Sequence, residues 1–179
     1  MKNGKLIFVI GPSGVGKDTI VNRVVDGDSF CKAISHTTRD IRPGEQNGVD
    51  YHFISNSEFR EFIGQGVFHE YALVYENYYG TMKTSITNPL KTGINIIKII
   101  EVDGAREMQK IYPDANFIFI NAPVDVLKQR LINRGDKLES IIKRLKRVEY
   151  EVSCIGMFNS VIINDDLNVA VQEFLNLLK

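Results

Sequence analysis

A glycine-rich loop near the beginning of the chain has the residue types and spacing that most directly indicate chemistry. The apolar residues 8–10 run straight into Gly11-Pro12-Ser13-Gly14-Val15-Gly16-Lys17-Asp18-Thr19. Glycines allow successive backbone N–H groups to converge on phosphate oxygens, and a lysine at the end of such a loop reaches the terminal phosphates. The loop therefore predicts a binding site for the phosphates of a nucleotide.

Asp18 departs from the usual form of this motif. The residue after the lysine is normally Ser or Thr, whose hydroxyl holds Mg²⁺, whereas the first hydroxyl here comes at Thr19. The loop indicates phosphate handling but leaves the metal ligand open.

Two arginines three residues apart, Arg39 and Arg42, form a second candidate phosphate site. Their planar guanidiniums offer paired donors that suit a dianionic phosphate, and Tyr51 and Tyr79 can add hydroxyl donors. An arginine pair in a loop is also a common partner in surface salt bridges. The residue types alone leave both interpretations open.

A third region, residues 128–151, carries eight Lys or Arg against four Asp or Glu. Apolar residues recur through it at helical spacing, so the basic side chains occupy the other faces of the helix. The pattern fits a solvated helix surface, and it equally fits a mobile flap whose arginines cover a polyphosphate.

The composition argues against several classes of partner. The 179 residues include 22 Lys and Arg and 22 Asp and Glu, so the formal net charge is zero. This balance argues against nucleic acid or an anionic membrane as a bulk partner. We see no charged-then-apolar leader and no apolar run near the roughly 18 residues that span a bilayer. We therefore expect a cytoplasmic protein.

The cysteines and histidines indicate no metal centre. Cys31 and Cys154 stand in no metal or redox spacing, and we expect both to be inert reduced thiols. His36, His52 and His69 have no second ligand at metal spacing, so we expect structural or solvent-facing roles.

Alternating strand and helix patterns are expected to position the candidate residues. Short, nearly continuous apolar runs predict strands covered on both faces, and hence a parallel sheet, at residues 8–10, 94–100, 116–120 and 161–163. Helical patterns fall at residues 18–25, 85–92, 105–111, 124–133, 138–152 and 167–178. Asp165-Asp166 is a suitable cap for the last helix. An α/β domain of this kind binds its ligand beyond the carboxyl ends of its strands.

Residues 35–83 interrupt this alternation. They contain scattered glycines, a tyrosine-rich patch that resembles a hairpin, and few long apolar runs. We interpret them as an inserted, partly β subdomain.

Motifs spread over the whole chain carry a family resemblance. They lie at residues 35–45 (Ser-His-Thr-Thr-Arg-Asp-Ile-Arg-Pro-Gly-Glu), 48–53, 68–70, 77–81, 104–106 and 163–167. Together with the glycine-rich loop they resemble the guanylate kinases, which are P-loop nucleoside monophosphate kinases. The resemblance implies a P-loop NTPase three-layer α/β sandwich with a mostly parallel sheet. A single guanylate-kinase-like domain, 1–179, would then comprise a core (1–34, 84–124 and 153–179), a GMP-binding insertion (35–83) and a helical lid (125–152).

The same resemblance implies a role for each site residue. ATP would be held by Gly11, Pro12, Ser13, Gly14, Val15, Gly16, Lys17, Asp18, Thr19 and Asn164. GMP would be held by Ser35, Arg39, Arg42, Tyr51, Glu70, Tyr79, Gly80, Thr81 and Glu101. Within that group, the residue matching Glu70 accepts from the guanine N1–H and amine, and the one matching Thr81 donates to the 6-oxo group. The catalytic residues would be Lys17, Arg42, Arg130, Arg134 and Arg144.

A second departure lies at the end of the strand predicted at residues 94–100. Guanylate kinases usually read Asp-Ile-Asp-x-Gln-Gly, whereas residues 99–104 here read Ile-Ile-Glu-Val-Asp-Gly. The first acid is lost at Ile99. We hypothesise that Asp18 gives Mg²⁺ a carboxylate that compensates for this loss, since carboxylates are good ligands for hard cations.

The function implied by the resemblance is ATP-dependent, Mg²⁺-assisted phosphoryl transfer to GMP, which gives GDP and ADP in purine nucleotide metabolism. The protein would be a monomer or homodimer that binds no nucleic acid and no membrane. Two alternatives are weighed. Ribose 1,5-bisphosphate kinases are similar in the Gly-Lys-Asp ending of the loop, but such an enzyme does not need Glu70 and Thr81. A phosphopeptide-binding scaffold of this fold usually loses the lysine that this chain keeps as Lys17.

Overall fold

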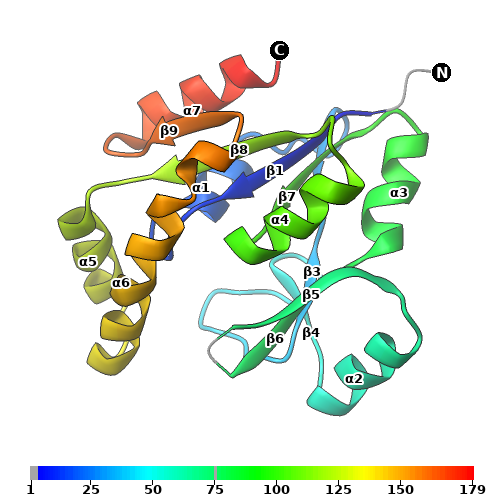
Figure 1. Cartoon of the computed structure of the whole chain (residues 1–179), viewed down its shortest axis with the longest axis horizontal. Coiled ribbons are helices and arrows are strands. Elements are labelled where there is room, and N and C mark those ends of the chain that lie inside the picture. The colour runs from blue at the N-terminus through cyan, green and yellow to red at the C-terminus, as the bar shows by residue number, and fades with distance from the viewer. Residues whose placement is uncertain (1–3, 75) are drawn as a thin grey trace.

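A five-stranded parallel sheet forms the centre of the computed structural model, which describes residues 4–74 and 76–179 (Figure 1). The strands lie in the order β2-β7-β1-β8-β9, and every neighbouring pair is parallel. Their bounds are β1 Leu6–Ile10, β2 Phe30–Lys32, β7 Asn95–Ile99, β8 Asn116–Asn121 and β9 Ser160–Ile163. The four strands predicted from apolar runs are confirmed to within a few residues, while the short strand β2 was not predicted.

Alternate side chains of the sheet build two cores, one on each face. Ile7 and Val9 pack with helices α1 (Lys17–Asn22) and α7 (Leu167–Leu177). Phe8 and Ile10 point to the other face, where they pack with α3 (Lys83–Lys91) and α4 (Val102–Ile111). Both faces are thus removed from water, which explains the near-continuous apolar runs. The result is a three-layer α/β sandwich, as predicted.

The predicted helices are all present, with shifted ends. The first and third differ most, because α1 ends at Asn22 rather than at residue 25 and α4 already begins at Val102 rather than at residue 105. The last helix is capped as predicted, since the side chain of Asp166 accepts from the backbone N–H groups of Asn168 and Val169. Among the described residues, no helix is long and apolar enough to cross a membrane.

A second sheet of four strands lies against the lower end of the central sheet in Figure 1. Its order is β4-β3-β6-β5, with bounds β3 Ser35–Thr37, β4 Tyr51–Phe53, β5 Phe68–Val74 and β6 Asn77–Met82. Strands β5 and β6 form the antiparallel pair indicated by the tyrosine-rich patch. Helix α2 (Asn56–Gly64) was not predicted; it packs Phe59 against Phe68 at 4.6 Å between ring centroids.

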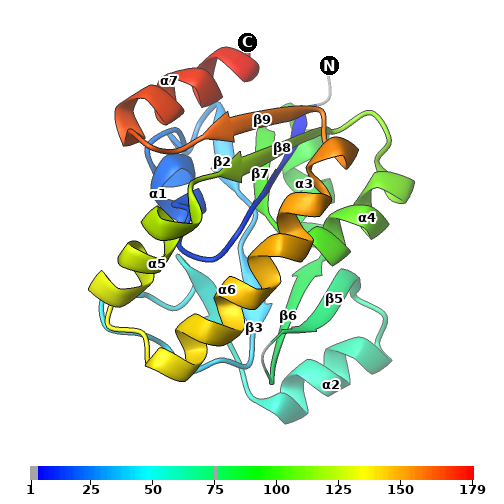
Figure 2. The ribbon, with the colours of Figure 1, turned by 60° about the vertical axis from the view of Figure 1, so that its left-hand side comes forward.

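Helices α5 (Val124–Asn133) and α6 (Leu138–Ser153) pack on one another and extend along the side of both sheets (Figure 2). Buried residues of both, Leu127 and Val148, belong to the core under β1. A short 3-10 turn, Ile155–Met157, then leads into β9. The helical pair therefore borders the carboxyl end of β1, where the glycine-rich loop begins.

Candidate active site

The glycine-rich loop, residues 11–16, turns directly from β1 into α1 and is closely packed against the strand end that carries Asn164. Gly16 has φ 96°, and a Cβ on it would lie 2.6 Å from Nδ2 of Asn164. That nitrogen donates to the carbonyl of Val15 at 2.7 Å. A side chain at residue 16 would therefore be strained in its backbone and would also displace the amide that holds the loop.

The ammonium of Lys17 lies over this loop. Nζ donates to the carbonyl oxygens of Gly11 at 2.5 Å and Pro12 at 3.1 Å. Both acceptors are uncharged carbonyls. The charged oxygens of a phosphate in the loop would bind the ammonium more strongly and take their place.

Arg39 is held by a carboxylate that the sequence did not single out. Its Nη2 donates to both oxygens of Glu45, at 2.8 and 3.0 Å, and Glu45 also accepts from the backbone N–H of Arg42 at 2.9 Å. Burial opposes ionisation of Glu45, but these hydrogen bonds prevail and lower its pKa. The guanidinium lies 5.6 Å from the ring centroid of Tyr51. Glu45 therefore fixes the side chain of Arg39 and the backbone of Arg42.

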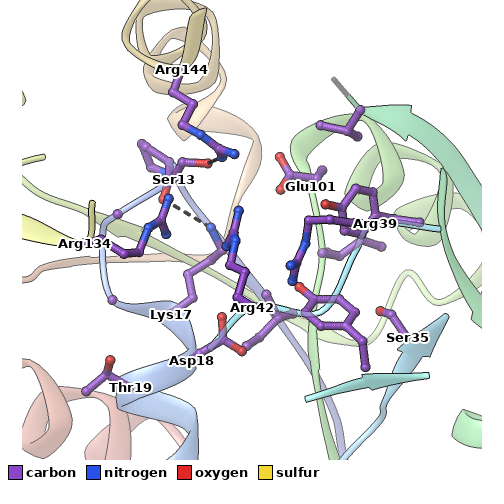
Figure 3. Close-up of a pocket in the computed structure, with 18 of the residues that line it drawn as sticks. Ser13, Lys17, Asp18, Thr19, Ser35, Arg39, Arg42, Glu101, Arg134 and Arg144 are labelled. Carbon is purple, nitrogen blue, oxygen red and sulfur yellow. Dashed lines mark hydrogen bonds between the residues drawn. The ribbon is translucent and has the colours of Figure 1, made fainter. Parts of the chain in front are cut away.

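Arg42 faces the arginines of the helical pair. In Figure 3, Arg42 and Arg134 point into the same space, and Arg144 lies next to Ser13. Burial, followed by the positive charges of Arg39, Arg134 and Arg144, lowers the pKa of Arg42. So many cations in one place repel one another, and a polyanion between them would relieve that repulsion.

The three arginines of the α5–α6 pair, Arg130, Arg134 and Arg144, have different partners. Arg144 donates to Ser13 of the glycine-rich loop at 2.8 Å, and Arg134 makes a two-point contact with Asp136. Arg130 donates to the backbone carbonyl of Asn164 at 2.9 Å, so it also supports the loop from behind. The α5–α6 pair is thus already in contact with the nucleotide loop.

Glu70 brings a carboxylate to the cavity from β5 of the second sheet. Its Oε1 accepts a short hydrogen bond from the hydroxyl of Thr81, which is fully buried. Burial raises the pKa of Glu70, while the ammonium of Lys98 and the Thr81 hydroxyl oppose that increase. Gly104 makes room for the carboxylate, since a Cβ there would approach Oε2 to 3.1 Å.

Asp18 begins the first turn of α1, and its Oδ1 accepts from Nζ of Lys32 at 2.8 Å. The side chain of Asp18 is 53 % exposed, so its carboxylate remains open to the cavity. In the described part of the chain, no cluster of three or more His, Cys, Asp or Glu has the geometry of a metal cage. Mg²⁺ in kinases is typically held by one or two protein ligands with the substrate phosphates and water, so a single open carboxylate beside Lys17 fits that ion.

Most of these groups line one cavity of about 470 Å³. The residues predicted from sequence that line it are Pro12, Ser13, Gly14, Gly16, Lys17, Asp18, Thr19, Ser35, Arg39, Arg42, Tyr51, Glu70, Tyr79, Glu101, Arg130, Arg134, Arg144 and Asn164. Four others are near it but not on its wall. Gly11 and Val15 contribute carbonyls to Lys17 and Asn164, Thr81 lies behind Glu70, and Gly80 packs against Phe59.

Sequence reasoning missed three residues that shape the site. Glu45 was quoted only as part of a motif, although a carboxylate close to two arginines is a usable signal. Lys32 and Lys98 lie in strands, and the sequence does not indicate which residues they contact.

Asp103, the residue that replaces a family glutamine, does not line the cavity. It accepts from Arg147 and Tyr150 of α6 at 2.9 and 2.5 Å and so links α4 to α6.

Glu151 is a further acid, on the buried face of α6. Burial, followed by the charge of Glu101, raises its pKa to about 7, while Lys17 and Arg147 oppose the increase. Its carboxylate accepts from Nε of Arg147 at 3.2 Å.

Comparison with known proteins gives the family. A family model described as guanylate kinase matches residues 3–179. The chain belongs to the guanylate kinase family. A guanylate kinase of Vibrio cholerae is 41 % identical over 179 residues, which cover 97 % of this chain and 86 % of that one. A guanylate kinase of Clostridium tetani is 37 % identical over 99 % of this chain and 86 % of its own length.

Solved structures agree with this assignment. The crystal structure of a guanylate kinase from Anaplasma phagocytophilum superposes with a TM-score of 0.79 at 26 % identity, over 99 % of this chain and 86 % of that chain. A gluconokinase from Sinorhizobium meliloti shares only the fold, with a TM-score of 0.51 at 14 % identity. The guanylate kinase family thus accounts for both the central sheet and the second one.

Proposed function

We propose that this protein is a nucleoside monophosphate kinase that transfers the γ-phosphoryl group of ATP to GMP and releases ADP and GDP. The observation that carries the proposal is that the glycine-rich loop and the Arg39–Arg42 pair line the same cavity. Two phosphate sites that face one another across a single cavity suit a reaction between two phosphorylated substrates.

Each substrate would contact a different wall of the cavity. The loop residues 11–19, with Asn164 behind them, would hold the ATP phosphates. Arg39, Arg42, Tyr51 and Tyr79 would hold the phosphate of the acceptor. Glu70 and Ser35 would read the base from the second sheet, in the insertion 35–83.

The reaction needs no strong base. An oxygen of the GMP phosphate, already an anion, would form a bond to the γ-phosphorus while the bond from that phosphorus to the β–γ bridging oxygen breaks. Lys17, Arg42 and the lid arginines would neutralise the charge on the equatorial oxygens as it develops. The lid, residues 125–152, would also keep out water that competes as an acceptor.

Mg²⁺ fits this site as a partner of ATP. Asp18 would hold it, and the ion would supply charge neutralisation between the β- and γ-phosphates. Protein groups, rather than the ion, would position the acceptor and the lid arginines.

The two alternatives have weaker support. A ribose bisphosphate kinase has no use for a buried Glu70 that accepts from Thr81, yet Glu70 lines the cavity and makes this hydrogen bond. A binding scaffold has no use for Lys17 or for an Arg144 that already contacts the nucleotide loop.

The test is a coupled assay of ADP production with GMP, dGMP, AMP and ribose 1,5-bisphosphate as acceptors. We expect turnover with GMP and at least about 10³-fold lower kcat/KM with AMP, because AMP would leave the buried Glu70 without a donor. Turnover with AMP in preference to GMP, or with the sugar phosphate alone, would refute the proposal.

A further inference from the structure

Lys98 is a buried cation in the middle of a central strand. It lies in β7 between Ile97 and Ile99 and is only 2 % exposed. An ammonium removed from water is destabilising unless hydrogen bonds or opposite charges compensate for the lost hydration. A leucine or isoleucine would suit the strand better, so the role of this lysine depends on the groups that it contacts.

The ammonium of Lys98 contacts the base end of the cavity. Nζ donates a short hydrogen bond to Oγ of Ser35 and lies 3.5 Å from the carbonyl oxygen of Ala33. Burial lowers the pKa of Lys98 to about 8; the charges of Glu70 on β5 and Asp18 on α1 oppose the decrease, and that of Lys32 on β2 adds to it. At neutral pH the group is therefore mainly protonated and has only hydrogens to offer.

This contact decides how the Ser35 hydroxyl is used. A serine hydroxyl has one hydrogen and two lone pairs, whereas an ammonium has no lone pair at all. Lys98 must therefore occupy a lone pair of Ser35, and the hydroxyl hydrogen has to point elsewhere. Ser35 lines the cavity, so that hydrogen is available to an acceptor on a bound ligand.

The neighbouring polar groups offer hydrogen-bond acceptors, whereas Ser35 offers a donor. Thr81 gives its only hydroxyl hydrogen to Oε1 of Glu70, so it has none left for a ligand while that bond lasts. The positive charge of Lys98 also favours the ionised, acceptor-only form of Glu70. The cavity wall thus offers one donor at Ser35 beside one acceptor at Glu70.

We propose that Lys98 is a positioning residue for base specificity, which holds Ser35 as a hydrogen-bond donor and Glu70 as an ionised acceptor. This inference rests on the proposed function. The pair fits a purine edge on which a carbonyl oxygen lies beside an N–H, as in guanine. It opposes an edge with an amino group beside a bare ring nitrogen, as in adenine, because both contacts would then be mismatched.

The test compares Lys98→Met with the wild type in steady-state kinetics with GMP and AMP. Methionine keeps the length of the side chain but cannot donate. Ser35 is then free to accept as well as to donate. We expect the KM for GMP to rise about 10- to 100-fold and the ratio of kcat/KM for GMP over AMP to fall by at least about tenfold. The KM for ATP should stay within about twofold, since Lys98 is not on the ATP wall.

A pH profile separates this role from mere packing. Loss of the nearby cation removes a charge that opposes protonation of Glu70, so the acid limb of kcat/KM for GMP should move to higher pH in Lys98→Met. Lys83→Met is the matched control, because Lys83 is exposed and donates to the carbonyl of Gly66. It should leave the profile where the wild type has it.

Ser35→Ala provides an independent arm that does not depend on how well Lys98→Met folds. Ser35→Ala should by itself reduce the preference for GMP over AMP. Lys98→Met should then reduce that preference by clearly less in the Ser35→Ala background than in the wild-type background. Unchanged preference in either single variant, or fully additive losses, would overturn the inference. A wild-type protein that prefers AMP would overturn the proposed function as well, which distinguishes the two failures.

Discussion

The ammonium of Lys32 lies 2.8 Å from the carboxylate of Asp18, and the lysine side chain is only 11 % exposed. Asp18 stands where most loops of this kind have a hydroxyl. Its charge is therefore partly balanced within the protein before any substrate arrives. Lys32 uses Oδ1 alone, which leaves the carboxylate able to meet a cation from the cavity side.

Asp18→Ser tests the proposed metal role. If the carboxylate contributes to Mg²⁺ binding, the variant should need several-fold more Mg²⁺ for half its maximal rate at saturating ATP and GMP. The measurement is a Mg²⁺ titration of ADP production. Asp28→Ser, in an exposed loop, is the control. Wild-type activity of Asp18→Ser at every Mg²⁺ concentration would rule out the role.

Glu45→Gln tests how the acceptor phosphate site is organised. The amide is uncharged and has one acceptor oxygen, whereas the carboxylate uses both oxygens to hold Arg39 and the backbone of Arg42. We expect the KM for GMP to rise about 5- to 50-fold with the KM for ATP unchanged, since charge-assisted bonds contribute about 1.5–3 kcal/mol. Glu61→Gln on α2 serves as the control. A rise in both KM values would instead indicate a general loss of structure.

Arg144→Met removes an arginine of α6 that contacts the glycine-rich loop through Ser13. Charge on the transferring phosphoryl group develops in the transition state, so the effect should fall mainly on kcat, which we expect to decrease by about 10²-fold or more. Single-turnover kinetics would separate this step from product release. Lys143→Met, exposed on the same helix, should stay near the wild-type rate; an equal decrease there would show that α6 acts only through its overall charge.

Glu151 gives a pH signature in stability. Its pKa is about 7 in the folded protein, against an ordinary value of 4.5, so the folded state favours the protonated carboxyl. The free energy of unfolding therefore has its full contribution from Glu151 below pH 4.5 and loses it as the pH rises through about 7. Glu151→Gln removes this loss. Relative to the wild type, its free energy of unfolding should rise with pH across that window by at most about 1.4 kcal/mol per unit.

Denaturant unfolding at a series of pH values measures this difference. Glu149→Gln on the exposed face of α6 is the matched control and should show no such slope. A flat difference between Glu151→Gln and the wild type from pH 4.5 to 7 would contradict the raised pKa.

The sequence by itself determined the central sheet and the phosphate loop. Both follow from local rules: strands covered on two faces are continuously apolar, and the glycines and Lys17 are neighbours along the chain. The arginine pair was equally visible. The short elements β2 and α2 escaped prediction, because their stability comes from packing such as that of Phe59 on Phe68 rather than from their own pattern.

Only the tertiary structure decided which distant charges meet. Lys32 and Asp18 are 14 residues apart, and Lys98 and Ser35 are 63 apart. A lysine in an apolar strand has no evident role in a one-dimensional pattern. Its role appears only because β2 pairs in parallel with β7, which brings the residues after β2, Ala33 and Ser35, to Lys98. Hydrogen bonds between side chains depend on distance in space, which the order of residues does not state. The P-loop could therefore be recognised from the sequence, whereas the polarity of the base site could not.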